Sequence, residues 1–308
     1  MPLTEEQRHD YVQDAEAFFA IMRRAGQWDG LLPDAVNLWL ENFDTPPLRY
    51  FACRILRGLL YYSERDTETL LREGLNHQVL GRLVRMEHQI PSAFSCYPSL
   101  LNYHLTSARQ RTLLVPLTTD ANPSESALQV TRVVRKRLHF PSANICFPNQ
   151  LVAQDFSKFK HVVVVDDNVG SGAQFREFWE NCPVDGTTVG RYLSQSGATL
   201  HYLVLIGTAS AVAQLRTDFP EVDFRCAQNL PDNYGVFAPA SVYWPDAEEQ
   251  AEAQQAVTQL FEGRGVTPVG WNGMTYAAVL HQIIPDWCLP ALWQKTVDWT
   301  PLIELSQR

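Results

Sequence analysis

The stretch that decides the fold runs from His161 to Gln174 and reads HVVVVDDNVGSGAQ. Its four consecutive valines predict a strand buried on both faces, because a half-exposed strand would alternate apolar with polar residues. Two carboxylates follow the valines, and Gly170-Ser171-Gly172 comes soon after. Charged side chains at the end of a buried strand need water or a ligand, and glycines let the backbone turn tightly. The stretch therefore predicts a strand, a polar loop and the start of a helix.

The residues around this stretch alternate between strand and helix patterns. We expect strands at 112–117, 144–147, 161–166, 200–207 and 222–226, and helices at 127–138, 172–181 and 209–217. Strands that alternate with helices form a parallel sheet with helices on its faces. The predicted fold class of this part of the chain is therefore α/β.

The residues before Arg111 have a different pattern, with apolar side chains at helical spacing from Thr4 to Gln110. We therefore expect two parts, a helical N-terminal region over residues 1–110 and an α/β domain over residues 111–308. The second part would include an acidic helix at 246–262 and an aromatic C-terminal segment.

The composition is that of a folded globular chain with acidic balance. Of the 308 residues, 45% are hydrophobic and 19% are charged, and the net charge is -9. This balance argues against a general nucleic-acid binder, whose surface has to neutralise phosphates. Positive charge is nevertheless concentrated just before the glycine loop. Between Gln129 and Lys160 the only acid is Asp155, and the basic residues are Arg132, Arg135, Lys136, Arg137, Lys158 and Lys160.

The six cysteines are spread too widely to form a chelating pair such as C-x-x-C. We expect them to be buried thiols of a reduced protein. No apolar run approaches the roughly 20 residues that a membrane-spanning helix requires, and the first residues, MPLTEEQRHD, lack a signal-peptide pattern. These features predict a cytoplasmic protein.

The order of residues in the 161–174 stretch predicts the kind of ligand. In an open parallel sheet, ligands bind beyond the carboxyl ends of the strands. The N–H groups of a glycine loop and of the next helix start attract a phosphate. Asp166 and Asp167 would repel that phosphate, so they suit another part of the ligand, either a vicinal diol or a divalent metal. A ribose 5-phosphate group satisfies both demands.

A hydrophobic strand, two acids, three residues and then Ser-Gly resembles the phosphoribosyl pyrophosphate motif of type I phosphoribosyltransferases. This resemblance implies that Asp166 and Asp167 hold the ribose hydroxyls, with Mg²⁺ as the accompanying ion. Gln174 departs from the family pattern, which often has Thr there. The resemblance also implies a 5′-phosphate site made of Asn168, Val169, Gly170, Ser171, Gly172, Ala173 and Gln174.

Type I enzymes also carry a pyrophosphate loop after an earlier strand, and the corresponding segment here is Thr118 to Ser126. Cations or Mg²⁺ are needed there, because negative charge builds on pyrophosphate as the glycosidic C–O bond breaks. A helix turns about 100° per residue, so the basic residues of 132–137 cannot all face one ligand. The resulting candidates for pyrophosphate contact are Ser124, Ser126, Arg132, Arg135 and Lys136.

A wider part of the chain is similar to the phosphoribosyltransferase-like proteins of bacterial conflict elements, including retron anti-phage systems. The similar segments are WLENF at 39–43, YFACRILRGLLYYS at 50–63 and PDWCLPALWQKTVDWTPL at 285–302. This resemblance implies a toxic effector of antiviral defence. Its helical region would then be a docking surface for a regulatory protein or ribonucleoprotein partner.

Three functions stay open. The first is an enzyme that binds phosphoribosyl pyrophosphate with Mg²⁺ and catalyses transfer or hydrolysis at the anomeric carbon. The second is a ribose-phosphate or nucleotide sensor without catalysis, and the third is an interaction scaffold. A P-loop ATPase does not fit, because the sequence contains no G-x-x-x-x-G-K-[ST]. A receiver domain or a dinucleotide-binding fold does not fit either, because Gly170 and Gly172 follow the acids and no third glycine stands at Phe175.

Overall fold

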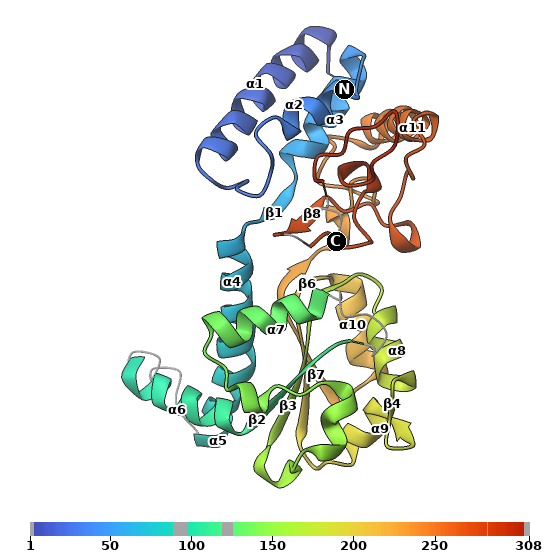
Figure 1. Ribbon diagram of the computed structural model, residues 1–308. Coiled ribbons are helices and arrows are strands. Elements are labelled where there is room, and N and C mark those ends of the chain that lie inside the picture. Colours follow the sequence, from blue (N-terminus) through green and yellow to red (C-terminus); the bar gives the residue numbers. More distant parts are fainter. Residues whose placement is uncertain (1–2, 89–97, 119–125, 282, 305–308) are drawn as a thin grey trace. The chain divides into compact units, whose positions relative to one another are not determined.

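The computed structural model describes residues 3–88, 98–118, 126–281 and 283–304 (Figure 1). The chain folds as two compact units. One consists of Met1–Thr67 together with Pro231–Arg308, and the other is Glu68–Leu230. This division does not coincide with the sequence-based boundary at residue 110, because the first helices share a unit with the C-terminal segment.

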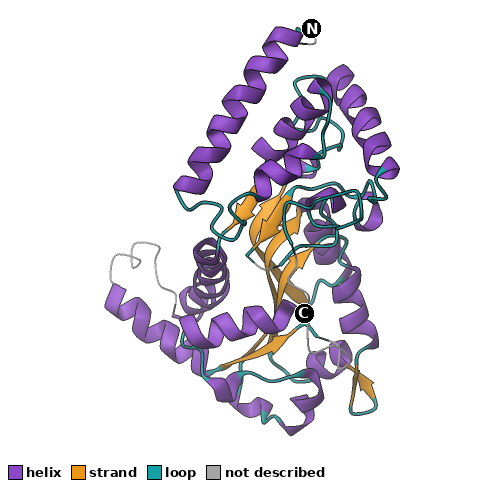
Figure 2. Ribbon diagram, turned by 45° about the horizontal axis from the view of Figure 1, so that its top comes forward, coloured by secondary structure: helices purple, strands orange, loops and turns teal. Residues whose placement is uncertain are grey.

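The unit Glu68–Leu230 contains a parallel sheet of four strands in the order β2-β3-β6-β7 (Figures 1 and 2). The strands are β2 (Thr112–Pro116), β3 (His161–Val169), β6 (Thr199–Thr208) and β7 (Val222–Leu230). Helices connect successive strands, so the predicted α/β fold with a parallel sheet is confirmed.

The helices of this unit include one π-helix, η1 (Glu73–Leu80). The α-helices are α5 (Gly81–His88), α6 (Pro98–Gln110), α7 (Ser126–Arg137), α8 (Ala173–Asn181), α9 (Val189–Ser194) and α10 (Ala209–Asp218). A small antiparallel pair, β4 (Pro183–Val184) and β5 (Thr187–Thr188), lies between α8 and α9 in the sequence.

The strand predicted at 144–147 is wrong. A 3₁₀ turn, Ser142–Asn144, occupies its start, and Ile145 makes only an isolated bridge to Leu114. The Asn144 side-chain amide donates to the carbonyl oxygens of Arg109 and Gln110, at 2.9 and 3.0 Å. These side-chain contacts fix the segment locally in place of a strand ladder.

The valine run forms a central strand, as predicted. Strand β3 pairs with β2 on one side and with β6 on the other. Val162 and Val164 lie in a buried cluster with aromatic residues of α8 and β6. On the opposite face of the sheet, the side chain of Leu203 contacts Gly74 of η1. A Cβ at position 74 would lie 2.6 Å from a methyl carbon of Leu203. Both faces of the sheet are therefore covered.

The other unit contains α1 (Glu5–Arg24), α2 (Ala35–Glu41), α3 (Pro46–Arg57), α11 (Ala247–Gly263) and two short strands. The strands β1 (Leu60–Tyr62) and β8 (Ala278–Leu280) pair in parallel. The sequence-based expectation of helix throughout Thr4–Gln110 is therefore wrong at β1. Helix α3 ends at Arg57 with Gly58 as its C-cap, and α4 (Glu64–Arg72) begins only after β1.

The C-terminal segment packs into this helical unit. The indole N–H groups of Trp39 and Trp299 donate to the same carbonyl oxygen, that of Ala291, at 2.8 and 2.9 Å. The Asn42 side chain donates to the Thr300 carbonyl and accepts from the Thr300 N–H, at 2.7 and 3.0 Å. These buried contacts join the first helices to the tail and explain why both belong to one unit.

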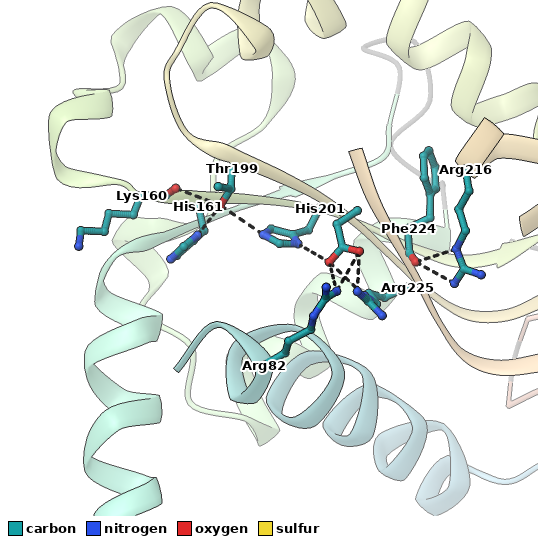
Figure 3. A network of polar contacts seen from close by, with 9 residues as sticks. Arg82, Lys160, His161, Thr199, His201, Arg216, Phe224 and Arg225 are labelled. Carbon is teal, nitrogen blue, oxygen red and sulfur yellow. Dashed lines mark hydrogen bonds and ion pairs between the residues drawn. The ribbon is translucent and has the colours of Figure 1, made fainter. Parts of the chain in front are cut away.

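A chain of polar contacts crosses the starts of β3, β6 and β7 (Figure 3). Thr199 Oγ1 lies 2.5 Å from His161 Nδ1 and 3.3 Å from His201 Nε2. His201 Nδ1 lies 3.2 Å from a carboxylate oxygen of Asp223, which also accepts hydrogen bonds from Arg82 and Arg225. His161 is 5% exposed, and this burial, aided by the nearby His201, lowers its pKa.

We expect acid to weaken the fold through His161. Its pKa in the folded protein lies below the ordinary value of 6.5, so the unfolded chain takes up the proton first as the pH falls. The contribution of His161 to the free energy of unfolding is complete above about pH 6.5 and is lost as the pH falls below that value. Substitution His161→Gln should therefore flatten the loss of unfolding free energy between pH 7.5 and 5.5 by up to about 1 kcal/mol, as measured by urea unfolding.

The carboxylates near this histidine act in a lower pH range. Burial alone would raise the pKa of Glu87 and of Asp223, but Arg111 outweighs it for Glu87, and His201 with Arg82 outweighs it for Asp223. Both pKa values are lowered, so the contributions of these carboxylates to stability fade only below about pH 4.5.

The control for His161→Gln is His77→Gln, because His77 is exposed. An equal dependence of stability on pH in the two variants would rule out His161 as the source.

Candidate functional site

The two aspartates lie inside β3 near its carboxyl end, and the strand continues past them to Val169. The sequence-based strand end at residue 166 is therefore wrong by three residues. Val169 pairs with Gly207 of β6, and a Cβ at Gly207 would lie 2.6 Å from a Val169 methyl group. A larger residue at position 207 would collide with Val169, so glycine is needed there. The pairing that lengthens β3 to Val169 therefore depends on a residue of β6.

Asp166 is 1% exposed, and both of its carboxyl oxygens have partners. One oxygen accepts from the Asp167 N–H at 2.9 Å, and the other accepts from the Tyr202 hydroxyl at 3.0 Å. Burial is the main cause that raises the pKa of Asp166 well above its ordinary value, and the neighbouring Asp167 charge raises it further. Both causes favour the neutral form of the Asp166 carboxyl group.

Asp167 is also 1% exposed, and one of its carboxylate oxygens accepts from the Asn168 side-chain amide at 2.7 Å. Its carboxyl group is close enough to exchange a hydrogen bond with that of Asp166. The structure thus brings together three of the predicted site residues, Asp166, Asp167 and Asn168. Because Asp167 is buried, a ligand hydroxyl group has to reach its carboxylate beside Asp166 before it can donate a hydrogen bond.

The loop after the strand is short and consists of Gly170, Ser171 and Gly172. Gly172 has φ +77° and precedes the first residue of α8, and a Cβ there would lie 3.0 Å from the Leu215 side chain. Both the left-handed conformation and the close contact require glycine. Ser171 Oγ accepts from the Ala173 N–H at 3.4 Å. The N–H groups of Gln174 and Phe175, in the first turn of α8, have no acceptor within the helix and can therefore face an anion.

Thr208 supports this loop, and sequence reasoning missed it. Its hydroxyl donates to the Gly170 carbonyl at 2.7 Å and accepts from the Ala211 N–H at 3.2 Å. Thr208 is 1% exposed and is the N-cap of α10. The pattern of Thr at the end of an apolar strand, directly before a helical segment, signals an N-cap in the sequence. Its second contact, to a loop 38 residues earlier, has no local signal.

A family model named PRTase-CE matches residues 36–304, which is most of the chain and includes both units. The chain belongs to the PRTase-CE family. This family is phosphoribosyltransferase-like, so the resemblance predicted from the HVVVVDDNVGSGAQ stretch is confirmed at family level. No curated protein matches the chain in the sequence search.

The remaining predicted site residues of this PRTase-CE protein are less closely grouped. Ala173 and Gln174 are exposed in the first turn of α8. Ser124 lies outside the described residues, and Ser126 is the first residue of α7. Arg132, Arg135 and Lys136 are exposed on α7, where spacings of three and four residues place them on one face. Arg137 lies 3.7 Å from Glu68 and is therefore part of an ion pair.

The acid pair suits hydroxyl groups better than direct Mg²⁺ ligation. Both Asp166 oxygens already accept hydrogen bonds, and its raised pKa disfavours the charged form that Mg²⁺ needs. Elsewhere in the described ranges, no group of three or more His, Cys, Asp or Glu side chains is arranged to hold a metal ion. None of the helices in those ranges is both long enough and apolar enough to span a bilayer.

We expect Tyr202→Phe to destabilise the protein by about 1–3 kcal/mol, because it leaves a buried Asp166 oxygen without a donor. Urea unfolding at pH 7.5 measures this loss. The matched control is Tyr192→Phe, since the Tyr192 hydroxyl makes only a long contact of 3.5 Å to the Leu151 carbonyl. Equal losses in both variants would contradict a specific role for the Tyr202 hydroxyl.

Proposed function

We propose that this PRTase-CE protein binds a ribose 5-phosphate group, as in phosphoribosyl pyrophosphate, at the end of β3. One arrangement supports the proposal best. A buried acid pair precedes a loop with a left-handed glycine, and α8 starts directly after that loop. The acid pair suits hydroxyl groups, and the helix start suits a phosphate.

The two aspartates would have different roles in this binding mode. Asp167 would accept hydrogen bonds from the ribose hydroxyls. Asp166, held by Tyr202 and the Asp167 N–H, would position its neighbour. The phosphate would lie against the N–H groups of Ser171, Gly172 and the first turn of α8, where the helix dipole favours negative charge.

The reaction that fits such a site is transfer or hydrolysis at the anomeric carbon. The C1–O bond to pyrophosphate breaks, and pyrophosphate leaves with the bonding electrons. An acceptor nitrogen or a water oxygen forms the new bond to C1 and releases its proton to solvent. Mg²⁺ would arrive with the pyrophosphate and neutralise its charge. The exposed basic face of α7, with Arg132, Arg135 and Lys136, would add positive charge.

A second candidate function is ribose-phosphate sensing without catalysis. Two observations favour it over transfer. Asp166 is fully engaged by its protein partners, and Gln174 stands exposed where the type I family often has Thr. If Asp166 stays hydrogen-bonded to its protein partners, the glycine loop can still bind the phosphate. The bond at the anomeric carbon would then stay intact.

We expect phosphoribosyl pyrophosphate with Mg²⁺ to bind the full chain in isothermal titration calorimetry. Asp167→Asn should weaken this binding about 10- to 100-fold, because a hydrogen bond to a charged group contributes about 1.5–3 kcal/mol. The matched control is Asp155→Asn, a carboxylate on the surface that pairs with Lys158 at 3.3 Å. Binding that is the same in both variants, or absent from the unaltered protein, would refute the proposed site.

A pyrophosphate-release assay then separates the enzyme from the sensor. Release that depends on Asp167 supports transfer or hydrolysis. Binding without release, across bases, nucleotides and water as acceptors, supports the sensor.

We also propose that the protein is a cytoplasmic effector of a bacterial anti-phage system, regulated by a protein or ribonucleoprotein partner. The resemblance of its end segments to conflict-element proteins supports this proposal. Induced expression in a bacterial host should slow growth, and Asp167→Asn should relieve that toxicity while Asp155→Asn does not. Growth curves and phage plaque counts measure both effects, and unchanged growth and plaque numbers with the unaltered chain and its neighbouring genes would contradict the proposal.

A further inference from the structure

The helical unit contains a cavity of about 410 Å³ that is separate from the β3 site. The α1 residue Tyr11 and the α3 residues Arg54 and Arg57 line it, together with Tyr234 and Tyr243. All five residues belong to the unit formed by Met1–Thr67 and Pro231–Arg308. Cavities of this size accommodate small ligands, whose pockets hold roughly 300–1,000 Å³.

Two guanidinium groups in this cavity lack an acidic partner. Among the described residues, no carboxylate forms an ion pair with Arg54 or Arg57. Some other arginines of the same unit are paired, as Arg49 is with Glu16 at 2.7 Å and Arg8 is with Glu252 at 2.8 Å. In a chain of net charge -9, two adjacent arginines without acids stand out as an anion site.

The surroundings hold these two cations in place without neutralising them. The guanidinium carbons of Arg54 and Arg57 lie 5.1 and 5.2 Å from the centre of the Tyr11 ring. Arg54 Nε also donates to the Tyr243 carbonyl at 2.9 Å. Both arginines are in the last turn of α3, where the helix dipole favours positive charge. Arg57 also makes a side-chain hydrogen bond with Tyr11, and because a guanidinium group has five N–H donors, each arginine keeps donors for a phosphate.

Tyrosine rings form the other polarisable surface of the cavity. Tyr243 is 5% exposed, and its hydroxyl donates to the Gly58 carbonyl at 2.8 Å, which fixes the ring beside the end of α3. Tyr234 is half-buried at the same cavity. Aromatic side chains next to arginines bind planar ligands by stacking.

We propose that this cavity binds a nucleoside monophosphate, with its phosphate on Arg54 and Arg57 and its base against the tyrosine rings. The site shares no residue with the β3 loop and lies in the other unit. The proposal is therefore independent of the ribose-phosphate function proposed above. It makes the helical unit a nucleotide-binding module in its own right.

Calorimetry on the full chain tests this site with AMP and UMP as probes. Binding of either nucleotide is expected, and Arg54→Gln with Arg57→Gln should weaken it about 10- to 100-fold. The matched control is Arg49→Gln on the same helix, because Arg49 is paired with Glu16 and does not line this cavity. Arg57→Gln alone keeps the Arg54 contact to Tyr243 and introduces no negative charge at the end of α3, so it should weaken binding with little change in melting temperature.

Further titrations distinguish this site from the alternatives. Asp167→Asn should leave AMP or UMP binding unchanged, and loss of binding in that variant would assign the nucleotide to the β3 site and overturn the proposal. Equal affinity for inorganic phosphate and AMP would overturn the role of the rings. A phosphotyrosyl peptide that binds where neither nucleotide does would replace the nucleotide with a peptide partner. Equal binding by the Arg54, Arg57 and Arg49 variants would refute the site altogether.

Discussion

The hydrogen bond from the Tyr202 hydroxyl to Asp166, 3.0 Å long and fully buried, constrains the fold and the site together. In the parallel ladder, Val164 pairs with Tyr202 and Asp166 pairs with Val204, so Asp166 and Tyr202 lie on the same face, one pair apart. A slip of one residue would turn Tyr202 to the opposite face and leave a carboxyl group unpartnered in an apolar cluster. The register between β3 and β6 thus buries the valines and also gives Asp166 its hydrogen-bond donor, Tyr202.

Burial and the neighbouring Asp167 raise the pKa of Asp166, whereas the Tyr202 hydrogen bond lowers it, so the Asp166–Asp167 pair matters most for the charge of the site. Two carboxyl groups in contact do not readily stay ionised together without a compensating cation, so the pKa of one member of such a pair is raised. Asp166 meets this condition, because burial and the Asp167 charge both raise its pKa. A single negative charge next to a phosphate loop repels an anionic ligand less than two would. The arrangement therefore reconciles an acid pair with phosphate binding a few residues later.

The sequence predicts the parts of this site that depend on neighbouring residues. The valine run, the acids and the glycine loop follow one another within HVVVVDDNVGSGAQ, and each has a local physical signal. The strand extension to Val169, the Tyr202 hydroxyl and the Thr208 contact to Gly170 depend on pairing between distant strands. The division of the chain into units also depends on distant contacts, because the Ala291 carbonyl that Trp39 and Trp299 share is 252 positions away from Trp39.

Net charge is a poor guide to anion binding in a chain of this kind. Electrostatic fields in salt solution decay over about 8–10 Å, so a ligand responds to the side chains around it and not to the total. The total of -9 gives no sign that Arg49 is paired with an acid while Arg54 and Arg57 form no ion pair with a described carboxylate. Those two lie over the Tyr11 ring and in the last turn of α3, where the ring face and the helix dipole stabilise a cation while it keeps its formal charge. An acidic chain can therefore keep local positive charge where dipoles and aromatic faces position the cations in place of carboxylates.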